Sequence, residues 1–240
     1  MSALLQELDY RLTGWPGALS LRRRANLSGG EDVYEIILNG EYLMSSRFTA
    51  AEEALAAIGL SHCAAPSIDV VIGGLGLGYT ARSALAHPRL ASLLVVDSLP
   101  EIVEWHLTGL LPLGTLLRSD PRCSLALGNF FTLAMSEDGL DASRPGRRFD
   151  AILLDIDHSP TKLLHPENAR FYEVDGLARM ARHLTPGGVF ALWSNDAVDA
   201  EFLARLQAVF ARVETERVRF EGLTGRSEQS NTLYIAALAR

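Results

Sequence analysis

The segment 69–82, with the sequence DVVIGGLGLGYTAR, constrains the fold of this chain more than any other. An apolar run that suits a buried strand breaks into the alternating glycines Gly74, Gly76 and Gly78 and then opens a helical pattern. Glycines are needed there because the chain turns sharply and because a Cβ would hold backbone amides away from a ligand. The segment therefore predicts a strand, a ligand-cradling loop and a helix, with a tight turn that binds nothing as the alternative.

Asp97 and Asn129 indicate what this loop would bind. Asp97 ends the next expected strand, about twenty residues beyond the glycines, where a carboxylate can accept both hydroxyls of a ribose. A helix cap for the segment after Pro100 is the competing role. Asn129 follows the third strand, where an adenine amino group would be met, or it is a turn asparagine. The glycine spacing is GxGxG and not GxGxxG, which disfavours a dinucleotide. An adenosyl cofactor is the leading interpretation.

From residue 68 onward, strands and helices alternate, which predicts a parallel sheet with helices on both faces. The last two strands follow one another through the polar segment 221–231 without a helix, so they should form an antiparallel hairpin. This order predicts an α/β fold with a Rossmann-like, seven-stranded, mostly parallel class I methyltransferase sheet. The strands are expected at 68–72, 92–96, 123–127, 151–155, 189–193, 213–220 and 232–237.

The N-terminal quarter has a different pattern. Short extended pieces are expected at 18–22, 33–38 and 41–44, and the Asn39-Gly40 pair between the last two is a strong hairpin signal. Thr49 followed by Glu52 matches a capping box, which predicts a helix from there to near Gly59. We therefore expect a small N-terminal β-hairpin unit with a linking helix at 1–60 and a Rossmann-like adenosyl-cofactor-binding domain at 61–240.

Composition limits the classes of partner. The formal net charge of -7 argues against a nucleic-acid backbone, which needs a basic face. No run approaches the ~20 apolar residues of a membrane span, so no membrane partner and a cytoplasmic location are expected. Cys63 and Cys123 have no CxxC spacing, and the histidines have no paired ligand spacing. We therefore predict neither a disulfide framework nor a metal.

The chain resembles the spermidine synthase (polyamine aminopropyltransferase) family over most of its length. The resemblance lies in the order and spacing of NGEYLMSSR, IGGLGLGY, VVDSLPEIVE, LGNFF, FDAILLDIDHSP, ENARFYEVDGLARMARHLTPGG and NTLYIAAL. It implies a methyltransferase-like fold, a small N-terminal β domain and a homodimer. It also implies a decarboxylated S-adenosylmethionine donor, which leaves as methylthioadenosine, and a small-molecule amine acceptor.

The candidate catalytic stretch is 150–160, DAILLDIDHSP. Asp155 ends the fourth strand at the carboxyl edge of the sheet, where open α/β sheets bind ligands. Alkylation by a sulfonium needs a deprotonated, positioned amine, so a carboxylate here would hold the amine and accept its proton. Asp155 matches the family's first catalytic aspartate and is also expected beside the cofactor. Asp157 and His158 follow as further catalytic candidates, with an ordinary polar loop turning on Pro160 as the alternative.

The positions at which this chain departs from the family pattern matter as much as those that match it. Gly76 stands where the family's glycine loop normally carries an aspartate that holds the donor amine, and His158 stands where a second catalytic aspartate is expected. The tyrosine-histidine pair after the N-terminal hairpin is replaced in the region 51–53. A glycine at position 76 would leave room for the carboxylate of ordinary S-adenosylmethionine near a helix N-terminus.

Three interpretations follow. The first is a spermidine-synthase-like aminopropyltransferase, and the second is a small-molecule methyltransferase that uses S-adenosylmethionine. The third is a non-catalytic homologue that binds a nucleoside or a protein. The collinear motifs favour the first, Gly76 motivates the second and the lost anchors motivate the third.

Overall fold

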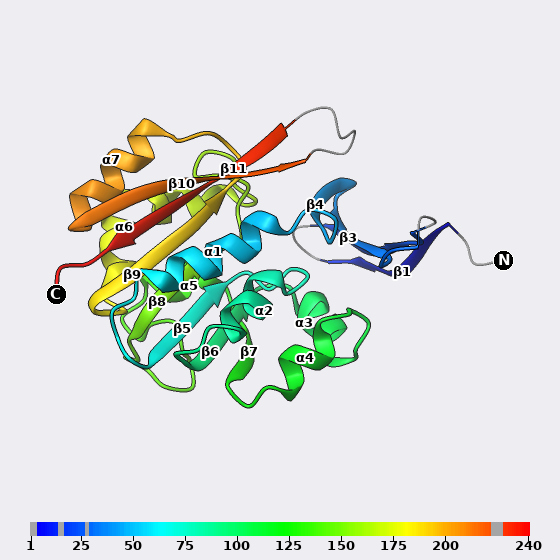
Figure 1. Ribbon diagram of the computed structural model, residues 1–240, viewed down its shortest axis with the longest axis horizontal. Coiled ribbons are helices and arrows are strands. Elements are labelled where there is room, and N and C mark those ends of the chain that lie inside the picture. The colour runs from blue at the N-terminus through cyan, green and yellow to red at the C-terminus, as the bar shows by residue number, and fades with distance from the viewer. Residues whose placement is uncertain (1–3, 14–16, 27–28, 222–227) are drawn as a thin grey trace.

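The computed structural model describes residues 4–13, 17–26, 29–221 and 228–240. They form two sheets. A four-stranded antiparallel sheet, in the order β1-β2-β3-β4, stands beside a seven-stranded sheet in the order β10-β11-β9-β8-β5-β6-β7 (Figure 1). The first sheet comprises β1 (Leu5–Leu12), β2 (Ala18–Arg24), β3 (Val33–Leu38) and β4 (Glu41–Ser45). The second comprises β5 (Ile68–Gly73), β6 (Leu90–Asp97), β7 (Cys123–Leu127), β8 (Phe149–Leu154), β9 (Leu184–Ser194), β10 (Arg212–Glu221) and β11 (Glu228–Ala237).

The large sheet confirms the predicted α/β fold. Strands β5 to β9 pair in parallel, whereas β11 runs antiparallel to both β9 and β10. All seven predicted strands are present: β7 has the predicted bounds, β9 begins five residues earlier than predicted, and the other strands differ by a few residues at their ends. The loop of the closing hairpin lies partly outside the described residues, at 222–227. Because β5 neighbours β6 on one side and β8 on the other, the chain reverses its order between β5 and β8, which is where such sheets bind ligands.

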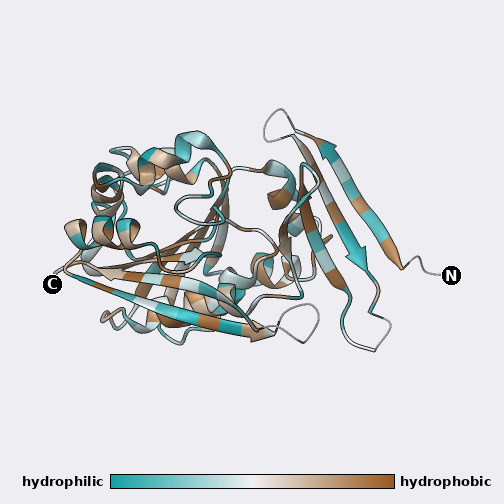
Figure 2. Ribbon diagram, turned by 90° about the horizontal axis from the view of Figure 1, so that it is seen from above, coloured by the Kyte–Doolittle hydropathy of each residue, from teal (hydrophilic) through white to brown (hydrophobic). Residues whose placement is uncertain are grey.

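Helices cover both faces of the large sheet. Side chains of β5 alternate between the two cores: Val70 and Ile72 pack with α1 and α2, whereas Val71 packs with α5, α6 and α7. Burial on both faces explains the near-continuous apolar runs of the parallel strands, which Figure 2 shows in brown. The helices are α1 (Ala50–Ser61), α2 (Tyr79–Leu85), α3 (Pro100–Leu107), α4 (Gly114–Ser119), α5 (Phe130–Met135), η1 (a 3-10 helix, Pro166–Tyr172), α6 (Val174–Ala181) and α7 (Ala200–Val209).

The N-terminal unit is larger than the predicted hairpin. The Asn39-Gly40 turn is confirmed, since both residues have positive φ, 52° and 84°. Strand β1 was not predicted, although Leu8, Tyr10 and Leu12 alternate with charged residues, because most of it is exposed and its apolar face is weak. The small sheet shares the core of α1 and α3, and the Trp105 indole donates to Asp9 at 2.7 Å. It is therefore fixed against the large domain.

Helix α1 corrects one sequence prediction and confirms another. Thr49 does precede the helix, but its hydroxyl bonds the Glu53 carboxylate at 2.7 Å and caps no backbone amide, so the capping box is wrong. The helix ends at Ser61, two residues beyond Gly59, near which the sequence predicts its end. A Cβ at Gly59 would lie 3.0 Å from the Leu153 side chain and 3.1 Å from that of Ala191. This glycine is there because helix and sheet approach closely.

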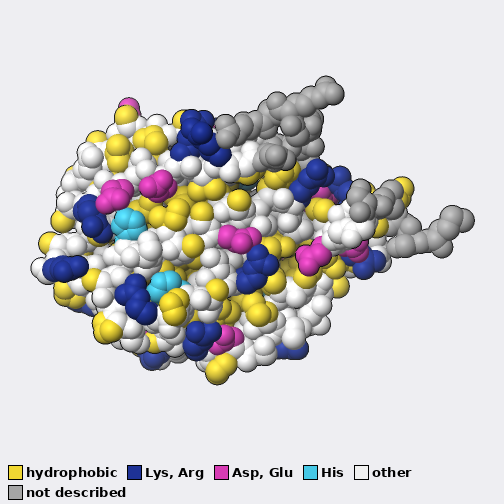
Figure 3. Space-filling model, viewed as in Figure 1, with side chains coloured by type: hydrophobic (Ala, Val, Ile, Leu, Met, Phe, Trp, Pro, Cys, Tyr) yellow, Lys and Arg dark blue, Asp and Glu magenta, His cyan; other side chains and the backbone are white. Residues whose placement is uncertain are grey.

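On the face that Figure 3 presents, basic and acidic side chains of the described residues are interspersed, with apolar side chains between them. Within the described segments, no helix has the length and apolar character needed to span a bilayer.

Candidate active site

A cavity of about 120 Å³ lies at the carboxyl ends of the parallel strands, at the point where the strand order reverses. Its walls come from both sheets: the β3–β4 hairpin, α1, the glycine loop after β5, the loops after β6, β7 and β8, and Trp193 on β9. Among the described residues, its lining includes carboxylates but neither lysine nor arginine. A cation in the cavity would therefore meet carboxyl groups that no lysine or arginine neutralises.

The glycine loop forms one wall of this cavity. Gly74 and Gly76 line it, with φ values of 97° and 47° that disfavour any residue with a side chain. A Cβ at Gly74 would collide with the backbone carbonyl of Asp155, so this glycine lets the ends of β5 and β8 approach each other. A Cβ at Gly76 would lie 2.8 Å from the Met44 sulfur, which accepts a hydrogen bond from the Leu77 amide at 3.2 Å. Met44 thus occupies the space expected to be open beside Gly76.

Gly78, the third predicted cofactor-binding glycine, lies behind the loop and not on the cavity wall. It is the N-cap of α2, with φ 91°, and a Cβ there would meet His106 and Leu117 at 3.0 Å. His106 is fully buried, and its Nε2 lies 2.9 Å from the Gly76 carbonyl. Burial lowers the pKa of His106, so a neutral imidazole supports the loop from beneath.

Asp97 lines the cavity at the end of β6 and is 8% exposed. One carboxylate oxygen accepts from the Leu75 amide and the other from the Leu99 amide, each at 2.8 Å. Burial raises the pKa of Asp97, and the surrounding backbone amides counter that rise. Asp97 does not cap α3, whose N-cap is Leu99, but it ties the glycine loop to the turn that leads into that helix. Its ribose-binding role remains a prediction.

Asn129 also lines the cavity, at the N-terminus of α5. Its Oδ1 accepts from the Thr132 amide at 3.0 Å, so the asparagine caps this helix. The side-chain NH2 group remains as a donor toward a ligand. Phe130 and Phe131 follow on the cavity wall, with Leu99 and Ile102 from the β6–α3 region, and these apolar side chains suit one face of an aromatic base.

Asp155 follows β8 and lines the cavity where Gly74 makes room for it. Its Oδ2 accepts a hydrogen bond from the Thr80 hydroxyl of α2 at 2.7 Å. Burial raises the pKa of Asp155 to about 6, with the Thr80 bond opposing that rise. A carboxylate with a pKa in this range is suited to accept a proton near neutral pH.

Glu52, a residue that the sequence interpretation assigned to a helix cap, is a second carboxylate of the same cavity. It extends from the first turn of α1, and its pKa is raised to about 8 by burial and by the negative charge of Asp155. Two carboxylates so placed share a proton near neutral pH until a cation joins them. A glutamate on the inner face of α1, one position from the buried Ala51, is the sequence signal that could have located it.

Of the other two catalytic candidates, only His158 reaches the cavity wall. Asp157 is 3% exposed, and its carboxylate accepts from the Leu164 amide at 2.6 Å, the Asn168 amide group at 3.1 Å and the Tyr172 hydroxyl at 2.8 Å. Burial raises its pKa, and these bonds oppose the rise. The structure therefore places Asp157 as the anchor of the loop between β8 and η1.

Trp193 closes the cavity on the side of β9. Its Nε1 is buried and has no hydrogen-bond partner among the described residues. A buried donor without a partner is costly, so the indole is a candidate contact for a polar atom of a ligand. Within the described ranges, no cluster of three or more His, Cys, Asp or Glu side chains is arranged to hold a metal ion.

The strand order, the closing hairpin and the cavity at the switch point define a class I methyltransferase-like fold with a small N-terminal β sheet. Solved spermidine synthases share it. The enzyme from Thermotoga maritima superposes with a TM-score of 0.72 and 17% identity, covering 97% of this chain and 72% of that one. A spermidine synthase in complex with the transition state analogue AdoDATO superposes with a TM-score of 0.71 and 16% identity, covering the same share of each chain. A probable spermidine synthase from Corynebacterium glutamicum superposes with a TM-score of 0.63 and 20% identity, covering 97% of this chain and 79% of that one.

Comparison of the sequence with curated proteins indicates the same kind of relative as the comparison of structures. Polyamine aminopropyltransferase 2 of Pseudomonas aeruginosa is 29% identical over 160 residues, which cover 62% of this chain and 41% of that protein. The chain thus spans less than half the length of this curated relative. No protein-family model matches the sequence. Sequence and fold together support the resemblance to the spermidine synthase-like family that the motifs indicate.

Proposed function

We propose that this chain is a spermidine-synthase-like transferase that alkylates an amine with an adenosyl sulfonium donor. The observation that carries the proposal is the carboxylate pair of Glu52 and Asp155, in a cavity whose described lining holds neither lysine nor arginine. A buried pair of this kind is costly unless a cation neutralises it. Both the sulfonium donor and a protonated amine are such cations.

The pair would serve the acceptor in two ways. An ammonium group binds between the ionised carboxylates, which lowers their pKa values and orients the nitrogen. Asp155 then takes a proton from that nitrogen and exposes its lone pair. The amine attacks the carbon next to the sulfonium. A nitrogen–carbon bond forms, the carbon–sulfur bond breaks, and its electron pair stays on sulfur, so the donor leaves as a neutral thioether nucleoside.

The adenosyl part of the donor would lie along the glycine loop. In this proposal Asp97 accepts the ribose hydroxyls with the lone pairs that the Leu75 and Leu99 amides leave open. The Asn129 NH2 group and the apolar wall with Phe130 and Ile102 receive the adenine. Gly74 and Gly76 allow the backbone to approach it closely. His158 and Trp193 complete the acceptor side of the cavity.

Aminopropyl transfer from decarboxylated S-adenosylmethionine is our first choice of reaction. It draws support from the printed names of the relatives, a polyamine aminopropyltransferase and spermidine synthases. Methyl transfer from S-adenosylmethionine is the second candidate, since Gly76 supplies no carboxylate for the amine of a decarboxylated donor. Met44 weighs against it, because its sulfur fills the space beside Gly76 and already accepts from the Leu77 amide.

The test is to identify the nucleoside released by the purified chain. Decarboxylated S-adenosylmethionine and S-adenosylmethionine are each incubated with the chain and a mixture of linear amines. The products are then separated and identified by mass spectrometry. Amine-dependent methylthioadenosine is the expected product, and S-adenosylhomocysteine would assign the chain to methyl transfer. If neither appears and neither donor binds by calorimetry, a non-catalytic homologue takes the place of this proposal. Asp155→Asn should lower this release by ~10²–10⁴-fold, whereas the exposed control Glu216→Gln should release as much as wild type.

A further inference from the structure

The two carboxyl groups of the cavity differ in the hydrogen bonds that they receive. Thr80 is 4% exposed on the first turn of α2, and its hydroxyl donates to Oδ2 of Asp155 at 2.7 Å. Among the described residues, no other hydrogen bond reaches the Asp155 carboxylate, so Oδ1 remains for a ligand. The Glu52 carboxyl has no side-chain donor in the described part of the chain, and the donor near it is its own backbone amide.

Helix α2 holds Thr80 in a fixed place relative to Glu52. Glu53, the next residue of α1, forms an ion pair with Arg82 at 2.8 Å. The backbone carbonyl of Glu53 also accepts a hydrogen bond from the Ser83 hydroxyl at 2.8 Å. These contacts tie the first turn of α1 to α2, so the hydroxyl and the glutamate approach the same aspartate from two helices that are fixed to each other.

This arrangement makes the two carboxyl groups unequal sites for a proton. A donated hydrogen bond favours the ionised form of a carboxyl group, whereas a neighbouring negative charge favours the protonated form. Asp155 has the donor, and Glu52 is acted on by the charge of Asp155. The proton that the pair shares near neutral pH is therefore more stable on Glu52. The pKa values have the same order, about 8 for Glu52 and about 6 for Asp155.

We propose that Thr80 is a positioning residue that determines which carboxyl group of the pair holds the shared proton. Its hydroxyl keeps Asp155 ionised and leaves Oδ1 for the ligand, while Glu52 carries the proton. The catalytic consequence rests on the proposed function, in which ionised Asp155 is the group that deprotonates the amine. Without this hydroxyl, Asp155 would compete with Glu52 for the proton, and part of the protein would lack its base.

Titration of the two carboxyl groups by carbon-13 NMR tests this assignment without any substrate. In wild type the Asp155 signal should titrate at lower pH than the Glu52 signal, each being identified by its loss in Asp155→Asn or Glu52→Gln. Thr80→Val keeps the shape of the side chain but removes the donor. The pKa of Asp155 should then rise by ~1–2, and the two midpoints should approach each other. Thr80→Ser keeps the hydroxyl and should restore the wild-type order.

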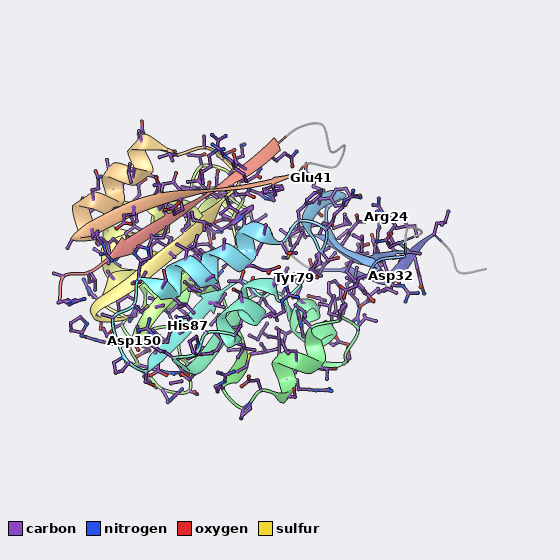
Figure 4. The ribbon with its side chains drawn as sticks, viewed as in Figure 1. Arg24, Asp32, Glu41, Tyr79, His87 and Asp150 are labelled. Atoms are coloured by element: carbon purple, nitrogen blue, oxygen red, sulfur yellow. The ribbon has the colours of Figure 1, made fainter. Side chains whose placement is uncertain are left out.

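Thr185→Val is the matched control, because the Thr185 hydroxyl donates a similar bond to Oδ1 of Asp150 at 2.9 Å. Figure 4 labels Asp150 at one end of the large sheet and Tyr79, the neighbour of Thr80, toward the other end. The control should therefore leave both titrations in the cavity unchanged. Every protein compared also keeps the other titratable side chains of the described cavity wall, which are Asp97, His158 and His165.

The titrations and the turnover assay separate this inference from the proposed function. Unchanged midpoints in Thr80→Val would overturn the role of Thr80 even if the chain alkylates amines. Should that variant fail to fold, a wild-type Asp155 that titrates above Glu52 would overturn it equally. The predicted titrations without turnover of any amine would keep the role of Thr80 and remove the function. Where both hold, the acid limb of kcat/KM against pH should move upward in Thr80→Val and return in Thr80→Ser.

Discussion

Replacing Glu52 with glutamine should make the stability of the protein less sensitive to high pH. The pKa of Glu52 is raised from the usual 4.5 to about 8 by burial and by Asp155. Between these values the folded protein keeps a proton that the unfolded chain has lost, so the free energy of unfolding falls as pH rises through this window. Glutamine at position 52 cannot ionise, so the variant should lack this part of the decrease in the free energy of unfolding.

The size of the effect follows from the same values. A rise from 4.5 to about 8 corresponds to at most about 5 kcal/mol at high pH. Water reaches part of the Glu52 side chain, which screens the charge, so we expect Glu52→Gln to gain ~1–3 kcal/mol over wild type near pH 9. Near pH 4 the two proteins should have nearly equal stability, because Glu52 is then protonated in both the folded and the unfolded states.

Urea unfolding followed by circular dichroism between these pH values measures the difference. Glu53→Gln is the matched control on the same helix turn, since Glu53 forms an ion pair with Arg82 at 2.8 Å. That variant should lose a little stability near pH 9, where Glu52→Gln should gain it. Parallel stability curves for wild type and Glu52→Gln would refute the placement of a buried, proton-holding carboxylate at position 52.

Three further variants test other parts of the site. Asp155→Asn should lower kcat for amine alkylation by ~10²–10⁴-fold while the donor still binds in calorimetry, and a near-normal kcat would exclude Asp155 as the base. Asp157→Asn should cost ~2–3 kcal/mol of unfolding free energy in urea, because a buried acceptor of bonds from Leu164, Asn168 and Tyr172 loses its charge; an unchanged midpoint would contradict the anchoring role. Gly74→Ala should lower the melting temperature and abolish donor binding, since its Cβ would collide with the Asp155 carbonyl, and normal donor binding would count against the described loop.

The features that sequence alone could locate are those set by local chemistry. The glycine loop is one, because positive φ at Gly74 and Gly76 requires glycine whatever surrounds it. The Asn39-Gly40 turn is another. The parallel strands were found because burial on both faces leaves apolar runs, and Asp97 and Asp155 were found because strand ends converge at one sheet edge.

What sequence could not locate depends on how distant elements pack. Glu52 reaches the cavity only because α1 lies across the large sheet with its first turn beside Asp155, and the local pattern favoured a cap instead. Asp157 stands two residues from Asp155, yet it turns to Asn168 and Tyr172 of η1. Met44 closes the space beside Gly76 from another sheet. Each of these positions is fixed by contacts between segments far apart in the chain.

The most direct test of the carboxylate pair is the number of protons released when an amine binds. At pH 7 Glu52, with its pKa of about 8, holds nearly one proton, and a bound ammonium group should expel it. Calorimetry of a linear diamine in buffers of different ionisation enthalpy gives this number. The account predicts about one proton released by wild type and close to none by Glu52→Gln. Equal release by the two proteins would contradict the claim that the amine is received between Glu52 and Asp155.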